Sequence, residues 1–385
     1  MKRALIVTAL AGFVRSFLME DIATLQSMGY EVHCAANAHH AGAGNVVEFL
    51  ETHDVVFHQV DFSSNKPLSG RTVKAYFQLR RLVYGTRFDF VHCHTPIAGA
   101  LCRVACRGMR RKRGMKVAYT THGFYFHAWS SKKTWLVFRT IENLMSQYTD
   151  VMITINHEDY ANARKMQCKD VRYIPGVGVD LRRFHDATVD RQDYRAKLGL
   201  SDEDFVVLAV GELSKRKNQK IIVEALAQCD IPHAVFLICG NAITGSEVRN
   251  GLEAEARAAH VDLRFLGLRK DIPQIDKCAD VGVLPSTREG LGLAGIEMLA
   301  AGLPVIGSNV HGIPDYIKDG VNGFLCDPYD AASFAKALTE AALPKVRERL
   351  RANCWQSVQA FDIAESRKAM RKIYADVLAP ESGTR

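Results

Sequence analysis

The sequence Ser286-Thr-Arg-Glu289-Gly290-Leu-Gly292-Leu-Ala-Gly-Ile-Glu297-Met-Leu-Ala-Ala-Gly302-Leu-Pro304-Val decides the fold of this chain. It follows a short apolar run at Val281–Leu284, which predicts a strand, and continues into an apolar stretch at Leu293–Ala301, which predicts a helix. The polar residues and glycines in between predict a tight turn. A strand that feeds a helix in this way is the repeating unit of parallel α/β folds.

The same alternation of short strands and amphipathic helices runs along the chain on both sides of this stretch. Further strands are predicted at Ala4–Ala9, Glu31–Ala36, Val55–Val60, Phe90–His94, Val117–Thr121, Val151–Ile155, Arg172–Ile174, Phe205–Val210, Ala234–Cys239, Leu263–Leu266 and Pro304–Ile306. Further helices are predicted at Ser16–Met28, Lys220–Gln228, Glu247–Ala259, Ala331–Ala341 and Val346–Ala375.

The segment Pro175–Asp180 interrupts the alternation, and a polar stretch follows it up to Asp204. We therefore predict two doubly wound, Rossmann-like α/β domains at residues 1–182 and 183–360, facing each other across a cleft. The helix and tail at 361–385 are predicted to cross back toward the first domain. Because open α/β sheets bind ligands at the carboxyl ends of their strands, functional residues are expected directly after strands.

Length and composition exclude several classes of protein. With 385 residues, 48% of them hydrophobic, the chain is too long for a mini-protein and too apolar for a disordered one. The ten cysteines show no paired spacing, which favours a reducing compartment. No apolar run approaches the ~20 residues that span a bilayer. We expect a cytoplasmic protein that is neither secreted nor integral to a membrane.

The net charge of +8 is unevenly distributed. Residues 1–182 hold 24 Lys and Arg against 14 Asp and Glu, a net charge of +10, whereas the remaining residues have a net charge of −2. This asymmetry predicts an anionic partner for the first half, such as a lipid surface or nucleic acid. The alternative is a solvated basic face without a partner.

The turn after Val281–Leu284 has the residues of a binding site for an anionic, hydroxyl-rich ligand. Gly290 and Gly292 allow a ligand to approach the backbone, and the start of the helix favours an anion such as a diphosphate. Glu289 and Glu297 lie ~9 Å apart along the helix axis, from a rise of ~1.5 Å per residue. They are candidates to accept hydrogen bonds from two parts of one ligand, such as a hexose and a ribose. The alternative is a glycine-rich loop with two solvated glutamates.

This segment resembles the signature of the retaining GT-B glycosyltransferases of family 4, which use nucleotide sugars. The resemblance implies the GT-B fold and no metal or other cofactor, with the UDP-sugar as donor substrate. It implies that Glu289 contacts the transferred sugar and Glu297 the ribose. The donor is expected to bind along the turn at Gly290, Leu291, Gly292 and Leu293.

A second region, Val210–Gln219, follows another predicted strand and resembles the part of the family that binds the donor diphosphate. Lys217 falls on the position of the family's diphosphate-binding cation. The family pattern also has Arg directly after Gly211, where this chain has Glu212. The candidates to replace that Arg are Lys215, Arg216 and Arg15. The alternative is a solvated charge cluster at a helix start.

Three shorter matches complete the resemblance. The backbone of Leu268 and Arg269 is expected to read the nucleobase. His122 follows the strand Val117–Thr121, where family members have a His that hydrogen-bonds the hexose; the alternative is a buried core histidine. Gly12 is expected in the first strand–helix loop, close to the donor. Lys217, Glu289 and His122 are the predicted catalytic residues.

His92-Cys93-His94 has the spacing of a metal-ligand pair, because residues i and i+2 of a strand share a face. No matching ligand pair is recognisable nearby in the sequence, so core and cleft-lining roles are favoured over a zinc site.

Basic and aromatic residues alternate in the first half of the chain, which is typical of an interfacial membrane contact or of nucleic-acid binding. In a GT-B enzyme this domain handles the acceptor, and the region around His122 resembles bacterial transferases that extend undecaprenyl-diphosphate-linked sugars. We therefore expect a contact with an anionic membrane and a lipid-linked glycan, and no nucleic acid. The residues concerned are Arg103, Arg107, Arg110, Arg111, Lys112, Arg113, Trp129 and Trp135.

These features together predict a retaining glycosyltransferase that moves a hexose or N-acetylhexosamine from a UDP-sugar to a lipid-linked glycan at the inner face of the cell membrane. Two alternatives remain: a GT-B-shaped nucleotide-sugar epimerase, which needs no acceptor, and a basic nucleic-acid-binding protein.

Overall fold

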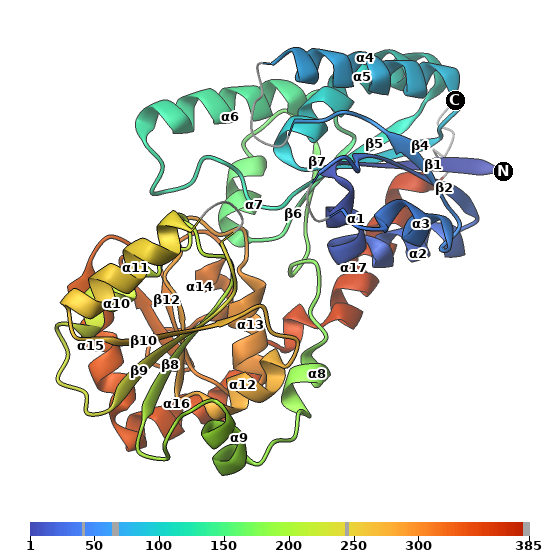
Figure 1. Cartoon of the computed structure of the whole chain (residues 1–385). Coiled ribbons are helices and arrows are strands. Elements are labelled where there is room, and N and C mark those ends of the chain that lie inside the picture. The colour runs from blue at the N-terminus through green and yellow to red at the C-terminus, as the bar shows by residue number, and fades with distance from the viewer. Residues whose placement is uncertain (41–42, 64–68, 243–245, 380–385) are drawn as a thin grey trace. The chain divides into compact units, whose positions relative to one another are not determined.

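The computed structural model describes residues 1–40, 43–63, 69–242 and 246–379. The chain divides into two compact units (Figure 1). Unit 1 contains Met1–Val177 and Ala364–Arg385, and unit 2 contains Gly178–Ile363. The structure thus places the boundary inside the predicted break but before residue 182, because the helix at Leu181–His185 packs against helices of the second unit.

Unit 1 is a seven-stranded parallel sheet in the order β3-β2-β1-β4-β5-β6-β7. The strands are β1 (Lys2–Leu10), β2 (Tyr30–Asn37), β3 (Val55–Gln59), β4 (Phe90–His94), β5 (Lys116–Thr121), β6 (Val151–Thr154) and β7 (Asp170–Tyr173). The helices are α1 (Ala11–Phe17), α2 (Met19–Ser27), α3 (Val46–Glu51), α4 (Gly70–Gly85), α5 (Pro96–Arg113), α6 (Lys132–Ser146), α7 (His157–Ala163) and α17 (Ile363–Leu378).

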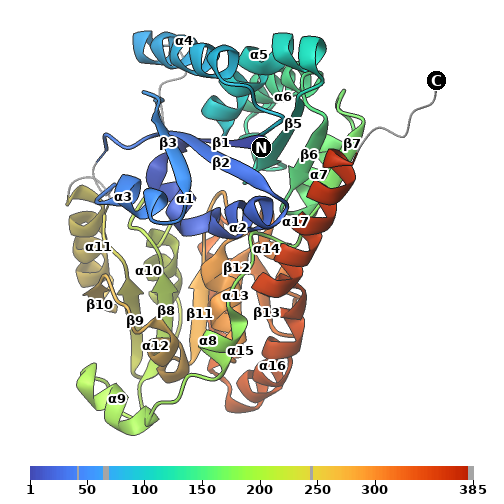
Figure 2. The ribbon, with the colours of Figure 1, turned by 90° about the vertical axis from the view of Figure 1, so that its right-hand side faces the viewer.

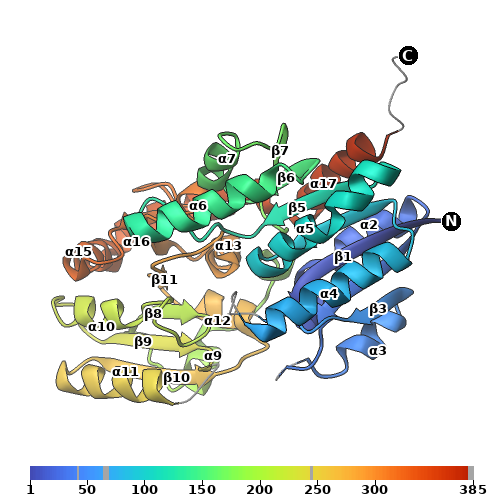
Figure 3. The ribbon, with the colours of Figure 1, turned by 90° about the horizontal axis from the view of Figure 1, so that it is seen from above.

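Helices cover both faces of this sheet, so its central strands are almost continuously apolar, as buried parallel strands are. Helices α4, α5 and α6 lie on one face, and α2 and α17 lie on the other (Figures 1 and 3). The C-terminal helix belongs to this unit because Tyr374, which is fully buried, packs its ring against Phe90 of β4.

Unit 2 is a six-stranded parallel sheet in the order β10-β9-β8-β11-β12-β13, and Figure 2 shows the strands from one edge of the sheet to the other. The strands are β8 (Phe205–Val210), β9 (Ala234–Cys239), β10 (Asp262–Gly267), β11 (Val281–Leu284), β12 (Val305–Ser308) and β13 (Gly323–Cys326). The helices are α8 (Leu181–His185), α9 (Arg191–Lys197), α10 (Lys220–Leu226), α11 (Glu247–Ala258), α12 (Ile272–Cys278), α13 (Leu293–Ala300), α14 (Ile313–Tyr316), α15 (Ala331–Ala342) and α16 (Pro344–Ser357), followed by the 3-10 turn η1 (Gln359–Phe361). The prediction of two doubly wound α/β units is confirmed.

Some element predictions were wrong. The expected helix Ser16–Met28 is two helices, because Leu18 leaves helical geometry between α1 and α2. Gly12 therefore lies inside α1 and not in a strand–helix loop. The expected helix Val346–Ala375 is likewise broken, and α16 and α17 are joined by η1 and the extended residue Asp362.

The strand β13 was not predicted as a sheet member, since it is only four residues long and begins with a glycine. A Cβ at Gly323 would lie 1.9 Å from the carbonyl oxygen of Val305, so glycine is what lets this strand approach β12. In the described part of the chain, no helix combines the length and the apolar character needed to cross a membrane.

Candidate functional site

The strand order of unit 2 reverses between β8 and β11, which makes the carboxyl ends of these two strands the place where a doubly wound sheet binds its ligand. The loop after β8 carries Lys217, and the loop after β11 carries Glu289. Asn218 joins the two loops: its side-chain amide donates to the carbonyl oxygens of Pro285, at 3.2 Å, and Pro328, at 2.9 Å.

Glycine is required where the second loop enters helix α13. Gly292 is the N-cap and has a left-handed backbone with φ of 79°. A Cβ there would lie 2.8 Å from Leu284 Cδ2 and 2.9 Å from Glu289 Cγ. The tight turn therefore holds Glu289 close to the start of the helix. The side chain of Leu291 is buried, so this residue can offer a ligand only its backbone, and Leu293 opens the helix.

Glu289 is the centre of a compact charged cluster. Its Oε2 accepts hydrogen bonds from Lys217 Nζ at 2.7 Å, Arg216 Nη1 at 3.0 Å and Ser286 Oγ at 3.2 Å. Burial alone would raise the pKa of Glu289, but the charges of Lys217 and Arg216 outweigh burial and hold the pKa below its usual value. The residue is therefore an ionised acceptor at neutral pH.

Arg216 also contacts Glu212, the residue that stands where the family pattern has Arg. Arg216 Nη2 donates to Glu212 Oε1 at 2.9 Å. Of the three candidates to replace that Arg, only Arg216 is seen to contact Glu289. Lys215 lines a separate cavity beside α10 and α11, and Arg15 of unit 1 bonds Asn45.

A cavity of about 420 Å³ opens beside this cluster, at the ends of β8, β9 and β10. Leu268 and Arg269, the residues expected to read the nucleobase, are part of its wall, and so is Glu212. Arg269 is paired with Asp271 through one edge of its guanidinium group: Nε donates to Oδ1 at 2.9 Å and Nη2 to Oδ2 at 2.5 Å, so its side chain is held. The other lining residues are Val210, Gly211, Cys239, Gly240, Asn241, Ala242 and Ile272.

Glu297 has a neighbour that the sequence did not reveal. Burial raises the pKa of Glu297, against a smaller effect of Arg183. Asp276 of α12 is 1% exposed, and neither carboxyl oxygen has a hydrogen-bond partner among the described residues. Burial first, and then the charge of Glu297, raise the pKa of Asp276 well above its usual value. Burial without a hydrogen-bond partner thus favours the protonated, uncharged form of Asp276. Its position within a short helix, between Ile275 and Lys277, gave no sequence signal.

The buried Asp276 should make the protein less stable as the pH rises. The folded state keeps the proton, whereas the unfolded chain releases it above about pH 4, so unfolding becomes easier at higher pH. Asp276→Asn removes this titration and is expected to raise the free energy of unfolding at pH 8 by about 1–3 kcal/mol. The gain should shrink toward pH 4. Urea unfolding at pH 4, 6 and 8 measures it, with the exposed Asp230→Asn as control; a pH-independent difference would contradict the prediction.

His122, the predicted hexose contact, lies directly after β5 in unit 1. Its Nε2 is 3.1 Å from His94 Nδ1, and its ring meets the Phe13 ring edge to face at a centroid distance of 4.9 Å. Burial lowers the pKa of His122 to about 4, so the imidazole is neutral and has one donor and one acceptor nitrogen.

The His92–His94 pair gains a partner that is far away in sequence. Ligand atoms of Asp21, His92 and His94 lie within 4.8 Å of one another. However, His92 already uses both ring nitrogens, with Nδ1 2.8 Å from the Tyr374 hydroxyl and Nε2 2.7 Å from Thr120 Oγ1. A metal ion bound by His92 would displace one of these hydroxyls. The arrangement fits a hydrogen-bonded anchor for α17 better than a zinc site.

The predicted basic surface needs correction. Arg103 is fully buried, where its Nη2 bonds Glu142 at 2.8 Å and its guanidinium stacks on the Tyr119 ring. It therefore cannot meet a membrane. Arg110 is half-buried and paired with Asp150, and Trp135 packs against the core. The predicted residues that are exposed are Arg107, Arg111, Lys112, Arg113 and Trp129.

The structure adds apolar side chains to this surface. Helices α4 and α6 flank α5 and expose Val73 and Phe77 on one side, and Leu136 and Leu144 on the other (Figure 3). Leu136 is 64% exposed. The three helices contain thirteen Lys and Arg and a single carboxylate, the buried Glu142.

Comparison with known proteins agrees with the geometry. Residues 16–183 match glycosyltransferase family 4, and residues 190–355 match the glycosyl transferases group 1 family. EpsD of Bacillus subtilis (strain 168), whose glycosyltransferase name is provisional, is 33% identical over 367 residues, which cover 94% of this chain and 93% of EpsD. The UDP-Gal:alpha-D-GlcNAc-diphosphoundecaprenol alpha-1,3-galactosyltransferase of Escherichia coli is 32% identical over 80% of each chain.

The fold has close structural counterparts. HepE of Anabaena, solved in complex with UDP and glucose, aligns with a TM-score of 0.77 at 21% identity, covering 98% of this chain and 100% of HepE. Together with the sequence relatives, this likeness shows that the chain is a glycosyltransferase with the GT-B fold and that it belongs to glycosyltransferase family 4.

Proposed function

We propose that the protein is a retaining glycosyltransferase that moves a hexose or N-acetylhexosamine from a UDP-sugar to an undecaprenyl-diphosphate-linked glycan, in the synthesis of a cell-surface polysaccharide or glycan. The observation that carries the proposal is the convergence of Lys217 and Arg216 on Glu289, beside the cavity at Leu268 and Arg269. The name of the Escherichia coli relative supports a lipid-linked acceptor of this class.

Each part of the donor has a matching group in unit 2. The cavity takes the nucleobase, Glu297 accepts the ribose hydroxyls, and Lys217 with the start of α13 holds the diphosphate. The carboxylate of Glu289 accepts hydroxyl hydrogen bonds from the hexose. The hexose contact of His122, a neutral imidazole of unit 1, stays a prediction from the sequence.

In the proposed reaction, the bond between the anomeric carbon and the diphosphate oxygen breaks, and Lys217 and the helix start stabilise the negative charge that develops on the departing oxygen. The acceptor hydroxyl attacks from the same face of the sugar, and its proton passes to the departing diphosphate. Retention of configuration follows from attack on that face. We propose that no metal is needed, because the protein itself supplies the positive charge.

A donor screen tests the proposal. The protein is incubated with individual labelled UDP-sugars, with and without extracted bacterial membrane lipids, and UDP release is measured. Release from one UDP-sugar that requires the lipid would support the proposal. Formation of a rearranged UDP-sugar without any acceptor would establish an epimerase instead. No release from any UDP-sugar, with lipid present, would overturn the proposed donor.

We further propose that α4, α5 and α6 dock on the inner face of the cell membrane. Their exposed surface joins basic side chains at the end of α5, such as Arg111, with the apolar stripes of α4 and α6. Cations attract anionic headgroups, and exposed apolar side chains enter the interface. The proposed docking brings the enzyme to the membrane that holds a lipid-linked acceptor.

Removing the apolar stripe of α6 should weaken membrane binding. The double variant Leu136→Ser/Leu144→Ser is expected to bind vesicles of phosphatidylglycerol and phosphatidylethanolamine about tenfold more weakly than the wild type, because two exposed leucines are lost from the interface. Co-sedimentation measures this, with Leu343→Ser on unit 2, an exposed leucine, as control. Equal binding of variant and wild type would contradict the docking face. Salt-sensitive RNA binding without vesicle binding would favour a nucleic-acid partner.

A further inference from the structure

Arg216 is held between two carboxylates by different edges of its guanidinium group. Nη2 bonds Glu212 at 2.9 Å, and Nη1 bonds Glu289 at 3.0 Å and the carbonyl oxygen of Arg288 at 3.0 Å. Its backbone is fixed as well, since its carbonyl oxygen accepts from the backbone N–H of Thr287 at 2.9 Å. The planar fork of arginine allows one edge to stay bonded while the other changes partner.

The cluster is electrically balanced without a ligand. Glu212 and Glu289 carry two negative charges, and Arg216 and Lys217 carry two positive charges. Both cations therefore neutralise Glu289, the residue that the proposed function assigns to the sugar. A diphosphate that enters beside the cluster offers Arg216 and Lys217 a stronger anionic partner than one carboxylate oxygen.

Glu212 accepts hydrogen bonds in this cluster, which an arginine side chain at the same position could not do. Ser214 Oγ donates to Glu212 Oε1 at 3.0 Å, and the side-chain amide of Gln219 donates to the Glu212 carbonyl oxygen at 2.8 Å. Glu212 is thus itself fixed at the wall of the cavity. From there it holds Arg216 by one edge and leaves the other edge directed at Glu289.

We infer that Arg216 is the second cation of the diphosphate site, that Glu212 is its positioning residue, and that a bound diphosphate moves the Nη1 edge of Arg216 from Glu289 to the ligand. The exchange removes one of the three donors that Glu289 Oε2 accepts from and makes this oxygen more available to the transferred sugar. The donor thereby prepares its own sugar site, because Glu289 loses one competing hydrogen-bond donor when a diphosphate binds. This inference rests on the proposed UDP-sugar donor.

Titration calorimetry with UDP and with uridine tests the inference by comparing the wild type with Glu212→Gln, Arg216→Gln and the double variant. We expect Arg216→Gln to weaken UDP binding about 30-fold, the loss of one charge-assisted contact, and to leave uridine binding unchanged within about twofold. Arg216→Lys keeps the charge but not the fork, so an intermediate loss is expected. Lys215→Gln, which changes a neighbouring cation outside the cluster, is the matched control.

The double variant distinguishes positioning from simple repulsion. Glu212→Gln alone should weaken UDP binding about three- to tenfold, because Arg216 loses the partner that orients it. Added to Arg216→Gln, the same change should instead improve UDP binding, because Glu212 is then an unpaired carboxylate beside a diphosphate. If Glu212→Gln weakens UDP binding in the wild type but strengthens it in Arg216→Gln, the inference is supported. If Glu212→Gln changes UDP affinity by the same factor in both proteins, the role of Glu212 is overturned.

The outcomes separate this inference from the proposed function. If the wild type binds UDP and Arg216→Gln binds it equally well, the role of Arg216 is overturned and the donor proposal stands. If the folded wild type binds no UDP at all, the proposed donor itself fails. Melting curves of each variant, matched to the wild type, confirm that a loss of binding reflects the contact and not unfolding.

Discussion

Glu289→Gln is expected to lower the rate of sugar transfer about 100- to 1,000-fold, while UDP affinity stays the same or increases. The carboxylate carries the negative charge and the acceptor oxygens that the proposed mechanism uses to hold the sugar as its bond to the diphosphate breaks, and loss of one preorganised group of this kind typically costs that much. The amide also releases Lys217 and Arg216 from their shared carboxylate. Both cations are then more available to UDP.

Initial rates of UDP release at saturating donor, together with calorimetry for UDP, measure the two effects. Glu348→Gln, a change of an exposed glutamate on α16, is the control and should leave both unchanged. A variant that lost transfer and UDP affinity in equal proportion would show that Glu289 holds the diphosphate site together, and would contradict a role in binding the sugar. Near-full activity would exclude Glu289 from the reaction altogether.

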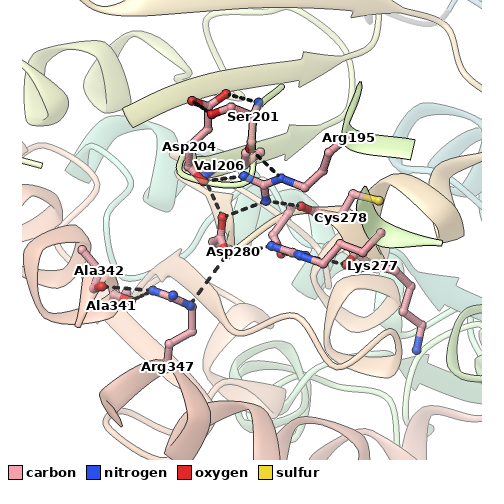
Figure 4. A network of polar contacts seen from close by, with 12 residues as sticks. Arg195, Ser201, Asp204, Val206, Lys277, Cys278, Asp280, Ala341, Ala342 and Arg347 are labelled. Atoms are coloured by element: carbon pink, nitrogen blue, oxygen red, sulfur yellow. Dashed lines mark hydrogen bonds and ion pairs between the residues drawn. The ribbon is translucent and has the colours of Figure 1, made fainter. Parts of the chain in front are cut away.

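Asp280→Asn is expected to lower the free energy of unfolding of unit 2 by about 3–5 kcal/mol, the usual cost of removing one partner from a buried ion pair. Figure 4 shows the network around this residue. Asp280 Oδ1 bonds Arg191 at 3.0 Å, and Oδ2 bonds the backbone N–H of Val206 at 2.9 Å and Arg195 at 3.3 Å. The guanidinium groups of Arg347 and Arg351 lie 3.7 and 3.9 Å away.

One carboxylate thus faces four arginines, and the excess positive charge is stabilised by helix ends. Arg347 donates to the carbonyl oxygens of Ala341 and Ala342 at the end of α15, and Arg195 donates to that of Cys278 at the end of α12. The carbonyl groups at a helix C-terminus attract cations, but they carry only partial charges and do not neutralise the arginines as a carboxylate does. Without Asp280, four like charges remain close together, and one of them, Arg195, is 1% exposed.

Differential scanning calorimetry should show the loss as a shift of about 10 °C in the transition of unit 2, at ~2–4 °C per kcal/mol for a unit of this size. Asp262→Asn is the matched control: Asp262 pairs with Arg264 at the surface, and such pairs contribute about 0–1 kcal/mol. A loss at Asp280 no larger than at Asp262 would contradict the structural role of the network.

The meeting of Lys217 and Glu289 in unit 2 could be predicted from the sequence. Glu289 and Lys217 each follow a strand, and the order of strands in a doubly wound sheet brings those two strand ends together. Gly292 was predicted as a residue that lets a ligand approach the backbone, and the structure adds that its turn requires a left-handed backbone. A local sequence pattern therefore suffices to predict a site residue when the strand order of the fold brings that residue to its partner.

Contacts made across long sequence distances were not predictable. Arg103 looked like one residue of an exposed basic run, but Glu142, 39 positions later, pairs with it in the core. Asp21 and Tyr374 lie close to His92 in the fold, although they come from opposite ends of the chain. No residue near His92 in the sequence predicts either neighbour. Asp276 was missed because a single acidic residue in a short helix normally points to solvent.

The C-terminal helix affects the order in which the two units can fold. Unit 2 is a continuous segment, whereas unit 1 needs residues from both ends of the chain. During synthesis, all of unit 2 is translated before α17, so the middle of the chain has its complete sequence before unit 1 does. The earlier strands must wait with the Phe90 and His92 side of their sheet uncovered until Tyr374 arrives. Unit 1 begins first and is completed last.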